Sequence, residues 1–217
     1  MNKTITLYFV RHGETLFNKL GRVQGWCDSP LTELGILQAK ALGISLADIA
    51  FNKVYCSTSE RAIDTANYII GKRKIKIHYS KKLKEVNFGT MEGSLESDII
   101  NDLRERQLGK GWADIGGDDE NLIKLRIEKG LNEIVENASN KDNILVVTHG
   151  AFLINVLKYI TNKKILPSSN KHKHPIPNCS VSIINYDNGL FSIVKYGDTS
   201  YLEKGLTEME RMCEDCV

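Results

Sequence analysis

The sequence predicts an α/β fold in which a mostly parallel sheet lies between helices and ends in an antiparallel hairpin. Short apolar segments rich in β-branched and aromatic residues alternate with segments of helical periodicity. Two of the apolar segments lead directly into a histidine and a glycine, at the position where parallel strands commonly carry a site. Towards the end of the chain, Asp187-Asn188-Gly189 separates two further strand-like segments, which is typical of a tight hairpin turn.

The expected strands are short, apolar and bounded by turn residues. They cover residues 5–10, 53–56, 75–79, 143–148, 179–186 and 190–196. The clearest helical patterns lie between them, at residues 31–48, 57–71, 120–137 and 151–159. One face of the first of these helices is formed by Leu34, Leu37, Ala41, Leu42 and Ser45. Residues 83–93 are expected to form a loop that leads into polar helical sequence, and residues 109–119, with four glycines, a mobile loop.

Length and charge exclude several classes of protein. A chain of 217 residues is long enough to bury the core of one domain. Its formal net charge of +2 gives no reason to expect nucleic acid or a membrane surface as a partner. The sequence has no apolar run of about 18 residues or more, and no signal-peptide pattern at its start. A cytoplasmic protein is therefore expected, and the sequence leaves a homodimer open.

The five cysteines are an odd number without the spacing of a disulfide framework. Cys213 and Cys216 form a C-x-x-C, and His172 and His174 form an H-x-H. These four side chains could together bind zinc, but nothing in the sequence brings the two pairs together. The competing interpretation of the C-terminal segment, a solvated and partly disordered tail, is favoured.

Two strand ends carry a histidine, and a helix between them carries an arginine. Arg11 and His12 end the apolar run of YFVRHGET, and NILVVTHGAF repeats this arrangement with His149. Because the carboxyl ends of parallel strands meet at one edge of a sheet, the two histidines can face each other. CSTSERAIDTA places Arg61 in the first turn of a helix, where N–H groups attract anions. The sequence therefore predicts a phosphate pocket.

With these motifs, the chain resembles the histidine phosphatase superfamily of phosphoglycerate mutase-like proteins. The resemblance covers nearly the whole chain and rests on YFVRHGET, QGWCDSPLTELGILQA, VYCSTSERAIDTA, LKEVNFGTMEG and VVTHG, in the family's order. It implies that His12 is the nucleophile that carries a transient phosphoryl group and that Glu85 donates a proton to the leaving group. The implied ligands of the phosphoryl oxygens are Arg11, Arg61, His149 and Asn18. Further implied substrate-binding residues are Thr15, Gln24 and Gly150.

These residue types suit phosphoryl transfer. Histidine attacks phosphorus only through a neutral ring nitrogen, and two neighbouring arginines disfavour its protonated form. The other ring nitrogen is expected to donate to a fixed acceptor such as a backbone carbonyl. Phosphoryl transfer needs mainly positioning and charge stabilisation, so the cationic cluster is expected to work without a metal or another cofactor. The glycine after each histidine is expected to let the backbone approach the anion closely.

Some candidate residues have a second interpretation. Thr15 and Asn18 either bind substrate or only stabilise their loop. Trp26 either lines the pocket or packs under Pro30. Glu85 has two rivals for the role of proton donor, Glu14 and Glu92, and its place in LKEVNFG favours it.

The predicted reaction follows from a difference between this sequence and the family's mutases. A mutase returns the phosphoryl group to its substrate and excludes water, whereas a phosphatase lets water attack the phosphohistidine. The family's mutases carry a longer insertion with an Arg-Arg pair, but residues 94–119 are short and have no adjacent arginines. The prediction is a phosphomonoester hydrolase that forms a single domain over residues 1–217, with residues 83–119 as an insertion over its active site.

The identity of the substrate stays open beyond a small phosphorylated metabolite, which could be a sugar phosphate, a phosphoglycerate, a nucleoside phosphate or a phosphoamino acid. The basic residues considered for a second anionic group are Arg104, Arg106, Lys110, Lys171 and Lys173. A phosphoglycerate mutase and a non-catalytic phosphate-binding module are the alternatives. The second would be indicated by loss of a catalytic residue, and none is lost.

Overall fold

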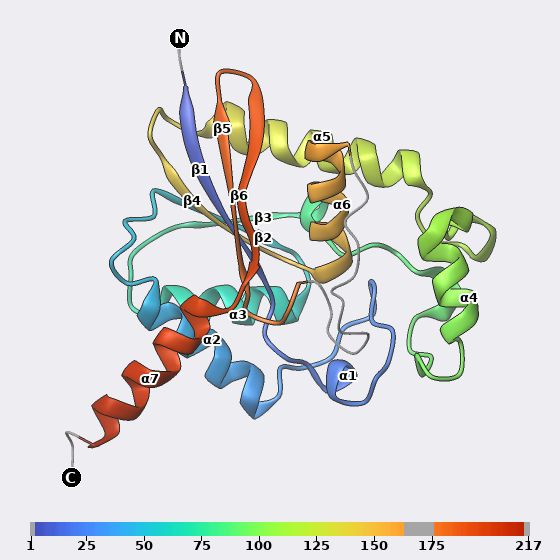
Figure 1. The fold of residues 1–217 in the computed structure, drawn as a ribbon, viewed down its shortest axis with the longest axis horizontal. Helices are drawn as coiled ribbons and strands as arrows, with labels where there is room; N and C mark the ends of the chain where they lie inside the picture. The colour runs from blue at the N-terminus through green and yellow to red at the C-terminus, as the bar shows by residue number, and fades with distance from the viewer. Residues whose placement is uncertain (1–2, 163–175, 215–217) are drawn as a thin grey trace.

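The computed structural model describes residues 3–162 and 176–214. Within them lies a six-stranded sheet with the strand order β3-β2-β4-β1-β5-β6 (Figure 1). The strands are β1 Thr4–Arg11, β2 Lys53–Ser57, β3 Ile77–Ser80, β4 Asn143–Thr148, β5 Val181–Asp187 and β6 Leu190–Asp198. Strands β3, β2, β4 and β1 are parallel, whereas β5 and β6 pair antiparallel. The predicted fold class is confirmed, including the hairpin.

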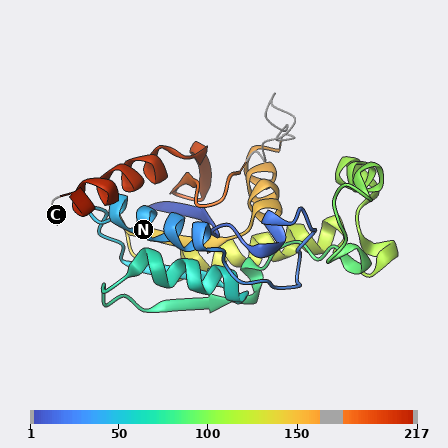
Figure 2. The same ribbon diagram turned by 90° about the horizontal axis from the view of Figure 1, so that it is seen from below.

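Helices cover both faces of this sheet (Figure 2). The helices are α1 Leu16–Lys19, α2 Glu33–Ser45, α3 Glu60–Ile70, α4 Ile100–Glu105, α5 Glu120–Asn137, α6 Gly150–Thr161 and α7 Ser200–Glu214. Short helical turns lie at Lys81–Leu83, Gly89–Met91, Arg106–Lys110 and Ala113–Ile115. Helices α2, α3 and α7 pack on one face, and α5 and α6 pack on the other. No helix in the described part of the chain is long and apolar enough to cross a membrane.

The side chains of strand β4 fix its register in the sheet, and with it the position of the strand's carboxyl end. Successive side chains of a strand point to opposite faces, so a strand covered on both sides must be apolar throughout. Ile144 and Val146 belong to the core beneath α5 and α6, and Leu145 and Val147 to the core beneath α2 and α3. All four side chains are fully buried. A slip by one residue would exchange the two faces, so the register with β1 is strongly specified.

Helix α2 buries a different face from the predicted one. Its start at residue 33 follows Thr32, whose hydroxyl accepts from the N–H of Gly35. Leu34 and Leu37 are exposed, whereas Gly35 packs so closely on the loop after β1 that an added Cβ would lie 2.0 Å from the Glu14 carbonyl oxygen. The prediction is therefore wrong for the two leucines, because small residues allow the close approach. It is confirmed for Ala41, Leu42 and Ser45, which are buried.

The C-terminal segment contains a helix that the sequence analysis did not predict. Helix α7 packs on α2, with Leu202 and Gly205 buried, and a Cβ on Gly205 would lie 1.9 Å from the Ala41 carbonyl oxygen. The tail that was expected to be solvated is CEDC at residues 213–216, and its first two residues end this helix and are exposed. Cys213 is exposed on this helix. The other three candidate zinc ligands, His172, His174 and Cys216, lie outside the described residues, as do Lys171 and Lys173.

Residues 109–119, where a mobile loop was expected, belong to a structured segment that covers residues 83–119. Helix α4 and the turns after it lie to one side of the sheet, beyond the start of α5 (Figures 1 and 2). Trp112 is buried and its ring meets that of Phe88 edge-on, with the centroids 4.7 Å apart. Arg106 is also buried, and its guanidinium pairs with Asp102 and Asp114. These contacts hold Arg106 within the segment, so it does not fit the role of a ligand for a second anionic group.

Candidate active site

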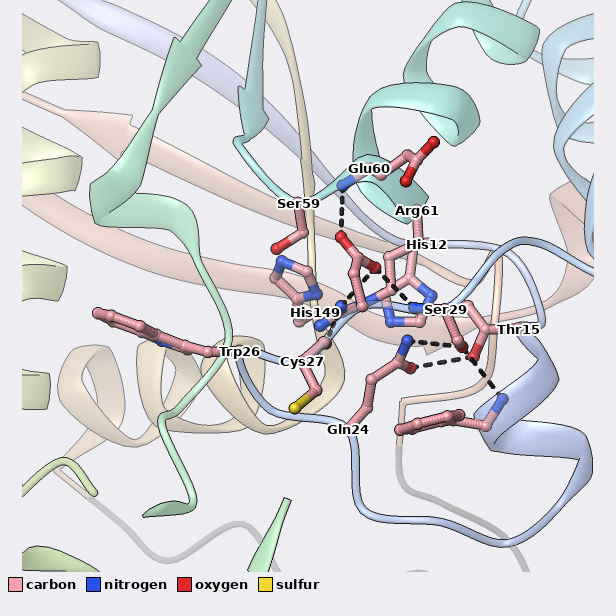
Figure 3. Close-up of polar contacts among 12 residues, drawn as sticks. His12, Thr15, Gln24, Trp26, Cys27, Ser29, Ser59, Glu60, Arg61 and His149 are labelled. Atoms are coloured by element: carbon pink, nitrogen blue, oxygen red, sulfur yellow. Dashed lines mark hydrogen bonds and ion pairs between the residues drawn. The ribbon is translucent and has the colours of Figure 1, made fainter. Parts of the chain in front are cut away.

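The register of β1 and β4 brings the two predicted histidines together. Arg11 pairs with Thr148 in this register, so His12 and His149 follow at neighbouring positions beyond the strand ends. The backbone N–H of His12 donates to the Thr148 carbonyl at 3.0 Å. The two imidazole rings lie with their centroids 5.2 Å apart and their planes at 63° (Figure 3). Both side chains are buried, with 3% exposure for His12 and none for His149.

Hydrogen bonding defines the tautomer of His12. Its Nδ1 lies 2.8 Å from the carbonyl oxygen of Gly13. A carbonyl can only accept, so Nδ1 carries the hydrogen and Nε2 carries the lone pair. The predicted donation to a backbone carbonyl is thus confirmed. The carbonyl of His12 accepts in turn from Nδ2 of Asn178 at 2.9 Å, which holds the backbone at the end of β1.

The glycine after His12 is needed for packing. A Cβ on Gly13 would lie 2.5 Å from the carbonyl oxygen of Gly35 in α2. The N–H of Gly13 donates to the hydroxyl of Thr65 in α3 at 3.0 Å. This position therefore lets the histidine loop fit between two helices, and the close approach of its backbone to an anion stays a prediction.

His149 is a buried neutral base at the start of α6. Burial, and then the positive charge of Arg61, lower the pKa of His149 well below its usual value. Its Nε2 lies 2.7 Å from Oγ of Ser57, whose oxygen also accepts from a backbone N–H two residues away. With the Ser57 hydroxyl donating to Nε2, the ring hydrogen lies on Nδ1. No partner for Nδ1 occurs among the described residues, so it is placed to donate to a ligand.

The two arginines are held by backbone carbonyls and differ in their surroundings. Arg61, the second residue of α3, is 1% exposed, and its Nη1 donates to Oδ1 of Asp28 at 2.8 Å. Arg11 donates from Nη1 to the carbonyl of Ile176 at 2.8 Å. Burial lowers the pKa of Arg11 to about 10, the carboxylate of Glu85 opposing this shift and Arg61 adding to it. The guanidinium group of Arg11 therefore remains cationic at neutral pH.

Three donors in this cluster point to an absent anion. The atoms are Nε of Arg11, Nε of Arg61 and Nδ1 of His149, each buried and without a hydrogen-bond partner among residues 3–162 and 176–214. Buried donors without acceptors are costly, and native structures rarely retain them. A phosphoryl group would supply several acceptor oxygens at one place.

Glu85 lies at the N-terminal end of α6, beside His149. Its side chain is 7% exposed, and both carboxyl oxygens accept from backbone N–H groups. Oε1 accepts from Val86 at 2.8 Å and from Phe152 at 2.6 Å, whereas within the described part of the chain Oε2 accepts from Ala151 alone, at 3.0 Å. Oε2 thus retains a lone pair that can carry a proton.

The rival carboxylates are engaged elsewhere. Oε1 of Glu14 accepts from the hydroxyl of Thr32 at 2.7 Å, at the start of α2. Glu92 accepts from three backbone N–H groups, of which that of Trp26 lies at 2.8 Å. The indole Nε1–H of Trp26 donates to the Glu85 carbonyl at 2.9 Å, and the ring is 43% exposed. Trp26 therefore lies beside Glu85, at the border of the pocket.

The other predicted binding residues support one another. The hydroxyl of Thr15 caps α1 and donates to Oε1 of Gln24 at 3.0 Å, while Nε2 of Gln24 donates to Ser29 at 3.0 Å (Figure 3). Oδ1 of Asn18 accepts from the N–H of Thr15 and from Nδ2 of Asn178. Gly150 is the first residue of α6. Contact of these residues with a substrate stays a prediction.

Four residues of the site were missed by the sequence analysis: Asp28, Ser57, Glu92 in its present role, and Asn178. Only Ser57 had a local signal, because it directly follows a predicted strand next to the phosphate pocket. The others act on segments far away along the chain.

The three cysteines Cys27, Cys56 and Cys179 are poor alternatives to His12 as the nucleophile. Burial raises the pKa of the Cys56 thiol far above its ordinary value and that of Cys179 to about 12. Cys27 is exposed, and slight burial together with the nearby Glu92 raises its pKa as well. The thiolate is the reactive form, so none of these cysteines is activated.

Comparison with known proteins identifies the family. Residues 7–199 match the sequence model of the histidine phosphatase superfamily, branch 1. The adenosylcobalamin/alpha-ribazole phosphatase of Salmonella typhimurium is 32% identical over 152 residues, which cover 68% of this chain and 75% of that protein. A probable phosphoglycerate mutase of Yersinia pestis is 28% identical over 218 residues, covering 95% of this chain and 100% of that protein.

The fold leads to the same family. The crystal structure of a phosphoglycerate mutase from Bacillus anthracis matches with a TM-score of 0.82 and 33% identity, covering 94% of this chain and 97% of that one. The sequence match over nearly the whole chain and this structural likeness agree with the arrangement of His12, His149 and the two arginines. The chain belongs to the histidine phosphatase superfamily.

Proposed function

We propose that this protein is a metal-independent phosphomonoester hydrolase that works through a phosphohistidine at His12. The observation that carries the proposal is the bond from Nδ1 of His12 to the Gly13 carbonyl, which leaves the lone pair on Nε2. That lone pair belongs to a ring whose centroid lies 5.2 Å from that of the His149 imidazole, in a cluster with Arg11 and Arg61, whose Nε atoms are both buried. A neutral imidazole of defined tautomer beside cationic donors has the properties that a nucleophile for phosphorus requires.

In the first step, Nε2 of His12 attacks the phosphorus atom and the bond from phosphorus to the ester oxygen breaks. The arginine guanidinium groups and Nδ1–H of His149 donate to the phosphoryl oxygens, which carry the charge of the transition state. Glu85 transfers a proton from Oε2 to the departing alcohol, because an alkoxide is too basic to leave unaided. The products are the free alcohol, a phosphohistidine and the Glu85 carboxylate.

In the second step, the Glu85 carboxylate removes a proton from a water molecule, whose oxygen attacks phosphorus. The bond between phosphorus and Nε2 breaks, and its electron pair returns to His12. Inorganic phosphate is released, and Glu85 is again protonated for the next turnover. Neither step draws on a metal ion or another cofactor, because the protein's own donors offset the charge.

Hydrolysis is proposed over mutase chemistry because residues 3–162 and 176–214 show no second site for an anionic group around the pocket. Residues 94–119 have no adjacent arginines, and Arg106 is bound by Asp102 and Asp114. The relatives carry both phosphatase and mutase names, so the reaction must be separated by experiment. The proposed partner is a small phosphorylated metabolite rather than a nucleic acid or a membrane.

The test is turnover by the purified chain. Nitrophenyl phosphate and a panel of alkyl phosphate esters should release inorganic phosphate. With 3-phosphoglycerate, isomerisation to 2-phosphoglycerate without phosphate release would support the mutase instead. Binding of phosphate without turnover of any ester would support the non-catalytic module.

A further inference from the structure

Residues 25–28 form a short segment that accepts hydrogen bonds from the guanidinium group of Arg61. Nη2 of Arg61 donates to the Gly25 carbonyl at 2.8 Å, and Nη1 donates to the Cys27 carbonyl at 2.9 Å. Nη1 also pairs with Oδ1 of Asp28 at 2.8 Å, and Oδ2 of Asp28 accepts from the N–H of Glu60 at 2.6 Å (Figure 3). The position of this segment therefore decides where the guanidinium group lies.

The backbone of residues 25–28 is held in turn by the carboxylate of Glu92. Oε2 of Glu92 accepts from the N–H of Cys27 at 2.7 Å, and Oε1 accepts from the N–H of Trp26 at 2.8 Å. Oε1 also accepts from Phe88, at 3.1 Å, which ties the segment to the turn that Glu92 ends. Gly25 has a positive φ of 58°, and a Cβ there would lie 2.2 Å from Oε1 of Glu92. The backbone is thus shaped to bring this carboxylate against it.

We propose that Glu92 is a positioning residue that acts on Arg61 through residues 25–28. The Glu92 carboxylate holds the N–H groups of Trp26 and Cys27, and the carbonyls on the same segment orient the guanidinium group. Nε of Arg61 is buried and has no hydrogen-bond partner among the described residues, so it is available to a phosphoryl oxygen. The expected effect of Glu92 on turnover rests on the proposed function, whereas its expected effect on phosphate binding does not.

The link to Glu85 is expected to be weaker than the link to Arg61. Trp26 donates to the Glu85 carbonyl, but that carbonyl also accepts from Nη2 of Arg126 at 3.1 Å. Loss of the Trp26 bond would leave the second donor in place. Disturbing the segment should therefore affect mainly the binding of the phosphoryl group.

The experiment is a double-mutant cycle on the binding of inorganic phosphate, measured by calorimetry on the full chain. Glu92→Gln keeps the size of the side chain but replaces one acceptor oxygen with a donor, so it should weaken phosphate binding about tenfold. In the background of Arg61→Ala, the same change should alter the affinity by less than about twofold. Asp28→Asn disturbs the segment at its contact with Arg61. It should also weaken phosphate binding about tenfold on its own and change it by less than about twofold in the background of Arg61→Ala. It serves in the cycle if Glu92→Gln does not fold.

A matched control is Glu133→Gln, because Glu133 pairs with Lys82 outside the pocket. It should leave phosphate affinity unchanged. An unchanged affinity in folded Glu92→Gln would overturn the inference, and so would an equal loss with and without Arg61. If the wild-type protein binds phosphate but hydrolyses no ester, hydrolysis is contradicted while the cycle still decides the role of Glu92.

Discussion

The hydroxyl oxygen of Ser57 lies 2.7 Å from Nε2 of His149, at the end of the strand next to the one that carries this histidine. Both groups are fully buried, so neither can exchange this bond for one to bulk water. Ser57 therefore holds the His149 ring at Nε2, and we expect Nδ1 to be the nitrogen that faces the phosphoryl group.

Ser57→Ala should lower kcat/KM for nitrophenyl phosphate about tenfold, because a buried hydrogen bond worth about 1 to 2 kcal/mol no longer orients the ring. The matched control is Ser45→Ala, since Ser45 is also buried but bonds only within α2. Steady-state kinetics of the two variants test this. Equal effects of both changes would contradict a specific role for Ser57.

The free energy of unfolding should fall as the pH drops below about 6.5. His149 has a lowered pKa in the folded state, so the unfolded chain binds an additional proton below that value. Stability from this group is present above pH 6.5 and is lost on acidification, by up to about 1.4 kcal/mol per pH unit. Urea unfolding from pH 7.5 to 5 would measure the loss. His149→Asn should flatten the dependence, and identical slopes for both proteins would contradict the assignment.

Glu85→Gln should separate proton donation from structural support. The change keeps the size of the side chain but removes the proton that an alkyl leaving group needs, so hydrolysis of an alkyl phosphate should fall roughly 10²–10⁴-fold. Nitrophenolate leaves without a proton, so that substrate should be affected far less. The measurement is the ratio of the two kcat/KM values, with burst kinetics to establish that transfer to His12 limits both. An unchanged ratio would send the search for the acid to Glu14 or Glu92.

Chelation should leave the activity intact. The positive charge at the proposed site comes from Arg11 and Arg61, so dialysis against EDTA should change kcat by less than about twofold. Loss of activity with EDTA and its return on addition of zinc or magnesium would refute the metal-free scheme.

The sheet and the central residues of the site could be predicted because their signals are local. Strand β4 is apolar throughout residues 144–147, as a strand covered on both faces must be. The histidines follow such strands directly, and the parallel register brings them together. Helix α7 was missed because its sequence is mostly polar and its contact with α2 depends on the small Gly205.

The supporting contacts could not be predicted, because they join segments that are distant along the chain. Asp28 lies 33 positions from Arg61, and Trp26 lies 66 positions from Glu92. Neither pair produces a periodicity or a turn signal. Arg61 could be expected near a phosphate from its place on α3, but its contact with residues 25–28 required the folded structure.

The central claim is that His12 carries the phosphoryl group, and covalent labelling tests it most directly. Protein mixed with a phosphorus-labelled ester, quenched and digested should yield label on the His12 peptide that is labile to acid and stable to base, as expected of a phosphorus–nitrogen bond. His12→Ala should take up none. Acid-stable label on serine, label on Cys56, or labelling of His12→Ala equal to that of the wild type would contradict the account.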